Sequence, residues 1–204
     1  MTDRIIERRP TVNTFEAMTA RRSIRKFRDE PVLEEDMERI LTAATRAPSG
    51  KNSQPWRFVV VKGDRRSEMV GIMRAGIEEK KSMEWDTGSS EWTAAIMEQA
   101  PVTVFVFNPE GTHPWLAHSI DQNFQDLVNI QSVGAAIQNM LLAATDMGIG
   151  SLWICDVFYA YEGLAAWLGE DCQMVAAVSF GYPAESPEAS PRKRVSEVVR
   201  TVGS

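Results

Sequence analysis

The stretch QDLVNIQSVGAAIQNMLLAATDMG, from Gln125 to Gly148, decides the fold class. It is the longest segment with helical character, it is rich in alanine and leucine, and it carries few charges. A helix that is apolar on nearly every side has to be surrounded by protein. Gly148 is a suitable residue to end it. We therefore expect one long helix, buried at the centre of the domain.

Strand and helix patterns alternate on both sides of this segment. Short apolar runs predict strands over 57–62, 101–108, 151–155 and 174–183. Helical patterns occupy 12–20, 33–47, 64–81 and 161–169. This mixed order around a buried helix favours an α+β domain over a doubly wound nucleotide-binding fold. The GIGSLW sequence supports that choice, because it follows a helix and precedes a strand, the reverse of the dinucleotide fingerprint.

Composition excludes several classes of protein. The chain has 204 residues and a net charge of −6, so it lacks the dominant basic surface that a nucleic-acid partner would need. Its first ten residues are charged and do not resemble a secretory signal, and no apolar run approaches the roughly 18 residues of a membrane helix. We expect a cytoplasmic protein without a membrane or nucleic-acid partner.

Cysteine and histidine usage points the same way. Cys155 and Cys172 form no C-x-x-C pair, and we expect reduced thiols. His113 and His118 lie five residues apart with no cysteine nearby, which is the wrong spacing for a metal site.

RRSIRKF, which begins at Arg21, is the first candidate binding segment. In an extended segment, side chains at alternate positions point the same way, so Arg21, Ser23 and Arg25 would share one side. Two guanidiniums beside a hydroxyl offer forked donors for a phosphate or for the carbonyl–nitrogen edge of a ring. The alternative is a solvated basic turn, balanced by the acidic residues that follow it.

APSGKNSQPWRF, which begins at Ala47, is a polar loop between two prolines. Its serine, asparagine and glutamine side chains offer donors and acceptors, and Gly50 lets the backbone approach a ligand closely. Such groups match the polar edges of a flat heteroaromatic ring. The alternative is an ordinary loop between a helix and a strand, with proline turns.

Two more segments could contribute. Arg192 and Arg194 in PRKR could clamp a phosphate, or could be a solvated charge run. Gly148 and Gly150 flank the start of a strand, where backbone N–H groups can face a ligand; a helix cap followed by a core strand is the alternative. The four segments share donors for a phosphate and a polar ring but no catalytic triad. That pattern is typical of a site for a cofactor that supplies its own chemistry.

Four segments resemble the nitroreductase family of FMN-dependent oxidoreductases, in the family's order and spacing: RRSIRKF, APSGKNSQPWRF, GAAIQNMLLAATDMGIGSLWI and FGYPAESPEASPRKRVSEVV. The resemblance covers residues 14–199 as a single domain and leaves 1–13 and 200–204 as terminal extensions. It implies a nitroreductase-like α+β fold with a central, mostly antiparallel sheet packed by helices. It also implies an intertwined homodimer with swapped terminal segments and two FMN sites at the interface.

The resemblance further implies which residues bind FMN: Arg21, Arg22, Ser23, Arg25, Pro48, Ser49, Gly50, Asn52, Gln54, Ile149, Gly150, Ser151, Cys155, Arg192 and Arg194. Arg21 and the two tail arginines would meet the phosphate. Arg25 would lie near N1 and O2 of the ring, where a fixed cation favours reduced flavin. The second subunit would contribute the loop 48–54, anchored by Trp56. Residues 149–151 would lie beside the ring, and the backbone N–H of Cys155 near N5.

The implied activity is hydride transfer from NADH or NADPH through FMN to an electron-poor acceptor, such as a nitroaromatic, a quinone or an enone, in a ping-pong sequence. No protein side chain would act as a catalytic group. The alternatives are a reductive dehalogenase, a flavin-degrading member of the family and a non-catalytic flavin-binding protein. Residues 80–92 suggest a mobile lid over the site. There, Glu84, Trp85 and Glu91 do not reproduce the Glu–Tyr–Lys set of the iodotyrosine deiodinase branch.

Overall fold

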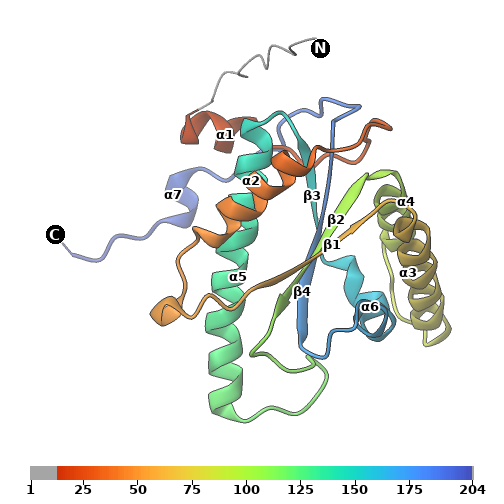
Figure 1. Ribbon diagram of the computed structural model, residues 1–204. Helices are drawn as coiled ribbons and strands as arrows, with labels where there is room; N and C mark the ends of the chain where they lie inside the picture. The colour runs from red at the N-terminus through yellow and green to blue at the C-terminus, as the bar shows by residue number, and fades with distance from the viewer. Residues whose placement is uncertain (1–12, 204) are drawn as a thin grey trace.

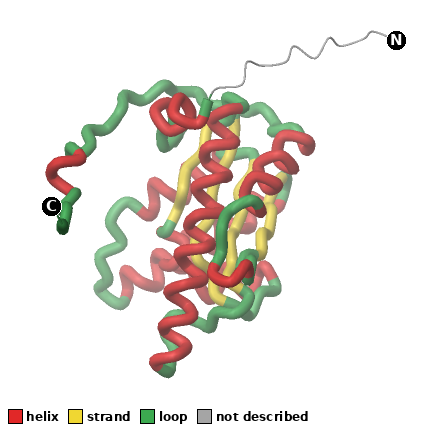
Figure 2. Tube along the Cα trace, turned by 90° about the vertical axis from the view of Figure 1, so that its left-hand side faces the viewer, coloured by secondary structure: helices red, strands yellow, loops and turns green. Residues whose placement is uncertain are grey.

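The computed structural model describes residues 13–203 and has a four-stranded antiparallel sheet with helices on both faces (Figures 1 and 2). The strands are β1 (Arg57–Lys62), β2 (Val102–Asn108), β3 (Gly150–Ile154) and β4 (Gln173–Gly181), in the order β1-β2-β4-β3. All pairs are antiparallel, and a register shift interrupts the β2–β4 pair between Val106 and Phe107. The α+β prediction is confirmed, and each strand lies where the sequence predicted it to within two residues.

The sheet separates two hydrophobic cores. Every residue of β2 is buried, and its side chains alternate between the two faces as strand geometry requires. Phe105 and Phe107 join one core, whereas Val104 and Val106 join the other. This double burial explains why β2 is an almost continuous apolar run in the sequence.

Helices cover each face. On one side lie α2 (Glu34–Thr45) and α5 (Ile120–Asp146), and on the other lie α3 (Arg65–Ser82), α4 (Ser90–Gln99), the 3-10 turn η2 (Asp156–Ala160) and α6 (Tyr161–Leu168). The remaining elements are α1 (Thr14–Ala20), the 3-10 turn η1 (Gly50–Asn52) and α7 (Val195–Val198). Helix α1 begins after the capping residue Asn13, so the expected start at Val12 lies outside the described residues.

The central helix differs from its prediction in its start and in its burial. It begins at Ile120, capped by Ser119, and only its C-terminal half is enclosed by the sheet and α2. The N-terminal half exposes Ile120, Phe124 and Leu127, which are 87%, 68% and 59% accessible and follow one another at helical spacing. Within residues 13–203, α5 is the one helix long and apolar enough to span a membrane by length and composition. Its packing against the sheet and α2 makes it a core helix of this domain.

The expected lid is helical at both ends and a connection in the middle. Residues 80–82 complete α3 and residues 90–92 begin α4, so only 83–89 form a connection. Sequence reasoning missed α4 because the glycine–serine breaks suggested a continuous loop. The buried side chains of Ala94 and Met97 fix this short helix to the core that contains Phe105 and Phe107.

The C-terminal tail crosses the body and then leaves it. After β4, Phe27 bridges to Pro183, and the Ala184 N–H donates to the carbonyl of Lys26. Residues 189–203 are exposed, α7 included, and extend away from the sheet (Figure 1). The prediction that this tail has no core of its own is confirmed.

Candidate functional site

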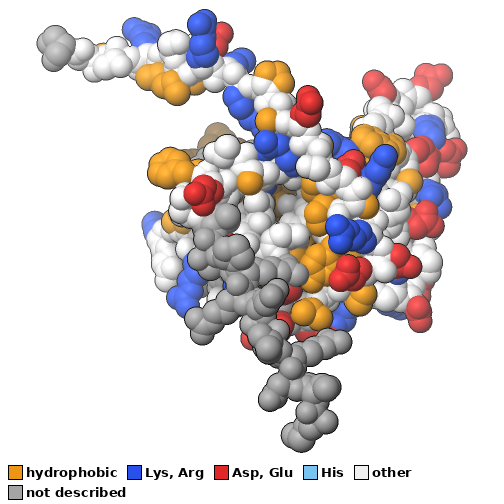
Figure 3. Space-filling view, turned by 90° about the horizontal axis from the view of Figure 1, so that it is seen from above, with side chains coloured by type: hydrophobic (Ala, Val, Ile, Leu, Met, Phe, Trp, Pro, Cys, Tyr) orange, Lys and Arg blue, Asp and Glu red, His pale blue; other side chains and the backbone are white. Residues whose placement is uncertain are grey.

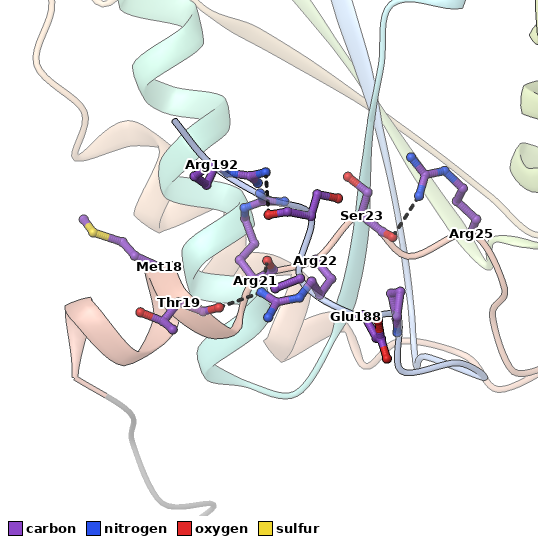
Figure 4. Close-up of a pocket in the computed structure, with 11 residues that line it drawn as sticks. Met18, Thr19, Arg21, Arg22, Ser23, Arg25, Glu188 and Arg192 are labelled. Atoms are coloured by element: carbon purple, nitrogen blue, oxygen red, sulfur yellow. Dashed lines mark hydrogen bonds between the residues drawn. The ribbon is translucent and has the colours of Figure 1, made fainter. Parts of the chain in front are cut away.

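A cavity of about 400 Å³ opens between α1, the segment after it and the tail (Figure 4). We call it the arginine cavity, and its lining residues are Met18, Thr19, Arg21, Arg22, Ser23, Arg25, Pro187, Glu188, Ala189, Ser190 and Arg192. It brings two of the predicted segments together, although about 170 residues of chain separate them. Its volume lies within the range of about 300–1,000 Å³ that is usual for ligand sites.

Local backbone geometry presents the arginines to this cavity. The chain leaves α1 at Arg21 in an extended conformation, with φ −55° and ψ 128°. Ser23 then pairs with Ser151, and the Ile24 N–H donates to the Ser151 carbonyl at 2.9 Å. Ile24 turns into the core, so the residues on either side of it face outward. The expected grouping of Arg21, Ser23 and Arg25 in one place is confirmed, and Arg22 lines the same cavity.

The tail holds this segment from the other side. One carboxylate oxygen of Glu185 accepts the backbone N–H groups of Arg25 and Lys26, at 2.5 and 3.2 Å. The chain then continues along the cavity to Arg192. Sequence reasoning did not identify Glu185, because no pattern of spacing reveals a contact between residues so far apart.

Arginines that line the cavity donate to backbone carbonyls of the described chain, although Glu188 also lines the cavity. Arg22 donates to the carbonyls of Thr19 and Arg21, and Arg25 donates to the Ser23 carbonyl at 3.4 Å. Arg192 likewise donates to carbonyls in its own loop. Within residues 13–203, none of the four lining arginines forms an ion pair with a carboxylate. Such unpaired guanidiniums favour an anionic ligand.

The predicted polar loop has an unusual backbone. Lys51, Asn52 and Gln54 have φ angles of 51°, 56° and 51°, the left-handed region that residues other than glycine seldom adopt. Hydrogen bonds hold the turn, since the Gln54 N–H donates to Ser49 Oγ at 2.9 Å. Trp56 packs against the core that contains Val104 and Val106, as expected of an anchor. Strained residues persist only where their surroundings fix them, and they often mark ligand sites.

This loop lies beside α5, away from the arginine cavity. The Gly50 N–H donates to Ser132 Oγ at 3.4 Å, and a Cβ on Gly50 would come within 2.7 Å of Val128. Arg22, by contrast, shares a shallow pocket with Thr145 near the other end of α5. Positions 132 and 145 of one helix are about 20 Å apart. None of Pro48, Ser49, Gly50, Asn52 and Gln54 lines the arginine cavity, so one chain does not bring the two predicted segments together (Figure 1).

The segment 149–151 has a structural role in this chain. Ile149 and Ser151 are buried, and Gly148, with φ 70°, ends α5. A Cβ on Gly150 would meet Ile24 at 2.9 Å, so close packing of the arginine segment explains this glycine. The hypothesis that Gly150 is needed for a ligand is therefore unnecessary at that position.

Cys155 and Arg194 also lie outside the cavity. Cys155 follows β3 and is exposed; partial desolvation of its thiol, and then the neighbouring Asp156, raise its pKa, so the thiol stays protonated at neutral pH. Arg194 caps α7 and pairs with Glu197, with 3.4 Å between Nε and Oε2. It lies within the exposed residues 189–203, and Figure 3 shows the tail projecting from the body. The predicted pair of tail arginines is thus split, with only Arg192 at the cavity.

A tryptophan completes the surroundings of Arg25. The guanidinium of Arg25 lies 5.5 Å from the ring centroid of Trp92 on α4. A second cavity, of about 480 Å³, adjoins this pair and includes Gln99, Glu185 and Pro187 among its lining. Sequence reasoning noted the tryptophans of this region but could not assign them a partner.

Comparison with known proteins agrees with this architecture. The profile of the Nitroreductase family matches residues 18–182. A protein of Archaeoglobus fulgidus, provisionally named NADH dehydrogenase/NAD(P)H nitroreductase, is 33% identical over 82% of this chain and 84% of its own length. The 5,6-dimethylbenzimidazole synthase of Rhodospirillum rubrum is 30% identical over 81% of this chain and 79% of its own length. The crystal structure of a provisionally named nitroreductase from Desulfovibrio desulfuricans, in complex with FMN, superposes with a TM-score of 0.72 at 28% identity, covering 95% of this chain and 99% of that one. The chain belongs to the nitroreductase family.

Proposed function

We propose that this family member is an FMN-dependent oxidoreductase that passes a hydride from NADH or NADPH to an electron-poor acceptor, such as a nitroaromatic, a quinone or an enone, in a ping-pong sequence. The observation that carries the proposal is the arginine cavity, which Arg21, Arg22, Arg25 and Arg192 line without forming an ion pair to any carboxylate among residues 13–203. The FMN complex of the Desulfovibrio desulfuricans relative and the nicotinamide-dependent names of other relatives support the choice of cofactor and donor.

The cavity fits the chemistry of FMN. A phosphate that is nearly doubly charged matches several forked cationic donors at once. The N1–O2 edge of a flavin ring becomes electron-rich on reduction, and it matches a single fixed cation such as Arg25. When bound, FMN supplies the redox chemistry, accepting a hydride from NAD(P)H and giving it to the acceptor.

The chain's own residues bind and orient. Arg21, Arg22 and Arg192 would hold the phosphate, and Ser23 would offer its hydroxyl between them and Arg25. Arg25 would keep its charge at any working pH, because a guanidinium does not lose its proton. Residues 149–151 pack beneath the segment 21–25 and would fix the position of that segment beside the flavin ring. The Cys155 backbone N–H would lie near N5.

The loop 47–56 would act on a second copy of the chain. Its exposed Asn52 and Gln54 make no side-chain hydrogen bond to the rest of the described chain. The exposed stripe Ile120, Phe124, Leu127 and Ile130 lies on the helix that supports the loop. Apolar patches of this kind mark interfaces between proteins. A two-fold dimer burying this stripe would bring each loop to its partner's arginine cavity, with the terminal segments exchanged. We propose such a homodimer, acting in the cytoplasm, where the free thiols of Cys155 and Cys172 would stay reduced.

The visible absorbance spectrum tests the core of the proposal. We expect purified protein, reconstituted with FMN, to be yellow and to bleach when NADH or NADPH is added without oxygen; the faster donor identifies the physiological nicotinamide. A protein that cannot be reconstituted with FMN would overturn the assignment.

Steady-state kinetics tests the order of events. The donor and the acceptor would use the same face of the flavin ring in turn. Double-reciprocal plots of rate against NAD(P)H concentration, measured at several acceptor concentrations, should therefore be parallel. Intersecting lines would indicate a ternary complex and contradict the ping-pong sequence.

A flavin-degrading activity is the second candidate, favoured by the relative from Rhodospirillum rubrum that is named 5,6-dimethylbenzimidazole synthase. The test is aerobic incubation with excess FMN and NAD(P)H, followed by mass spectrometry. Formation of dimethylbenzimidazole would replace the first proposal, whereas intact FMN after many turnovers with an added quinone would support it.

A further inference from the structure

We propose that Trp92 is a positioning residue for the flavin site, holding the Arg25 guanidinium at the place where it faces the flavin ring. This inference rests on the proposed function, because it concerns the cation that function assigns to N1 and O2. It adds a residue from α4, a helix outside every segment that suggested the cofactor. The argument depends on how Trp92 is held, what it touches and what chemistry it adds.

The contact is between a cation and an aromatic face. The Arg25 Cζ atom lies 5.5 Å from the centroid of the Trp92 ring, within the roughly 6 Å over which such pairs attract. Besides this ring, the described residues offer the Arg25 guanidinium one acceptor, the Ser23 carbonyl at 3.4 Å. That hydrogen bond is long, so the ring is a major restraint on the direction of the side chain.

Trp92 is held in place although its side chain is 56% exposed. Its neighbour Glu91 pairs with Lys81 on α3 at 2.9 Å. Its other neighbour, Thr93, donates its hydroxyl to Asp156 of η2 at 2.5 Å. The first turn of α4 is thus fixed to two other elements, and it presents the ring to Arg25 on a rigid support.

An aromatic partner has an effect that a carboxylate could not have. An acidic residue at this position would neutralise the guanidinium and weaken its attraction for an electron-rich ring. The face of an indole attracts a cation without removing its charge. Glu185, the nearest tail carboxylate in the hydrogen-bond network, instead accepts backbone N–H groups of Arg25 and Lys26. The arrangement therefore restrains Arg25 and leaves its full charge available.

The experiment compares Trp92→Ala and Trp92→Phe with the wild-type holoprotein, measuring the midpoint potential of bound FMN and the FMN dissociation constant. Without the ring, Arg25 samples more solvent-directed conformations, and reduced FMN loses part of its stabilisation. We expect Trp92→Ala to weaken the preference for reduced over oxidised FMN by about fivefold. For a two-electron couple that is about 20 mV toward lower potential. Trp92→Phe, which keeps an aromatic face, should recover most of the loss.

Trp85→Ala is the matched control. Trp85 is a neighbouring tryptophan, 50% exposed, whose ring lies over Lys80 rather than an arginine of the site. We expect its substitution to leave the potential unchanged. A shift as large as that of Trp92→Ala would indicate a general effect of apolar surface and would overturn the inference.

A double-mutant cycle tests whether Trp92 acts through Arg25. In an Arg25→Ala background, Trp92→Ala should change the potential no further, because the restrained cation is already gone. An equal shift in both backgrounds, or no shift from Trp92→Ala in wild type, would overturn the inference while FMN binding and nicotinamide reduction stand. Wild-type protein that binds no FMN would instead overturn the proposed function, and the inference with it.

Discussion

The arginine cavity and the polar loop were predicted to bind the same ligand, yet they lie in separate places on one subunit. The cavity is assembled within one chain from α1, the segment 21–25 and the tail. The loop is held in a strained conformation beside α5, with its polar side chains exposed and no part of that cavity near it. One region is assembled within a single subunit, whereas the other lies apart from it, and we propose that it contacts the ligand of a second subunit.

This difference has a physical reading. Lys51 and Gln54 adopt the left-handed region at a cost in free energy that asparagine, as at position 52, largely avoids, and an isolated subunit gives no functional reason for that cost. The exposed stripe on α5 beside the loop is equally unexplained in an isolated subunit. A second copy that covers the stripe accounts for both, since it would bring a cavity to each loop.

The largest expected effect comes from a substitution at the proposed dimer interface, which would separate the loop from the cavity of the second subunit. Leu127→Glu places a charge in the exposed stripe, and burying it against a partner without a counter-charge is strongly unfavourable. We expect the dissociation constant of the dimer to rise by at least about 100-fold, since burying an unpaired charge costs several kcal/mol. Bound FMN should be lost with it. Sedimentation velocity and the flavin-to-protein absorbance ratio measure the two losses.

Met83→Glu is the control for that substitution. Met83 is also an exposed apolar residue, but it follows α3 on the opposite side of the sheet. It should leave the dimer and its flavin intact. A monomeric Leu127→Glu protein that still binds FMN as tightly as wild type would contradict the shared site, and the loop would then be no more than a structural turn.

A second prediction sharpens the comparison inside the cavity. Arg21→Ala removes a charge-assisted contact to the phosphate, which is typically worth about 1.5–3 kcal/mol. The FMN dissociation constant should therefore rise by roughly 10- to 150-fold. Arg194→Ala, which removes an arginine paired with Glu197 outside the cavity, should raise it much less. Fluorescence titration of apoprotein with FMN measures both; equal effects would show that the tail rearranges to bring Arg194 to the phosphate.

The contrast between these arginines shows what the sequence could predict. An extended segment of suitable residue types was enough to place Arg21, Ser23 and Arg25 together, although Arg22, which alternation would turn the other way, lines the same cavity. Arg192 and Arg194 look equivalent in the sequence, and only the path of the tail separates them. Strands β2 and β4 and the C-terminal half of the central helix were predictable because a buried strand or helix must be apolar along its length, whereas β1 is apolar although only Val61 in it is buried. Helix α4, the contact of Trp92 with Arg25 and the exposure of half of α5 depend on tertiary packing, which spacing along the chain does not encode.

A third prediction concerns the stability of the fold at alkaline pH, where the buried thiol of Cys172 titrates. Burial, and then the hydrogen bond and charge of Glu170, raise the pKa of Cys172 from its usual 9.0 to about 11. The folded state therefore keeps a proton that the unfolded chain loses, so this contribution is complete below pH 9 and is lost as pH rises toward 11. Solvent screening limits the effect to about 1 kcal/mol.

Urea denaturation at pH 8 and pH 10.5 measures this contribution. The wild-type midpoint should fall more between these two pH values than that of Cys172→Ala, which has no thiol to titrate at this position. Cys155→Ala is the control for an exposed cysteine beside the candidate site. Equal pH dependence in wild type and Cys172→Ala would assign the alkaline loss of stability to other groups.

The smallest effect tests whether the loop is shaped for function. Lys51 has φ 51°, a conformation that costs a residue with a Cβ about 1–2 kcal/mol. Glycine removes that cost but adds roughly 0.5–1 kcal/mol of unfolded-state entropy, so Lys51→Gly should raise the free energy of unfolding by a few tenths to about 1 kcal/mol. Gly63→Ala, at φ 63° in open space, is the reciprocal control and should destabilise. A gain in stability with unchanged FMN affinity would show that the backbone conformation, rather than the Lys51 side chain, is what the second subunit requires. A loss of stability would mean that Lys51 makes a compensating contact and that the loop is not strained at this residue.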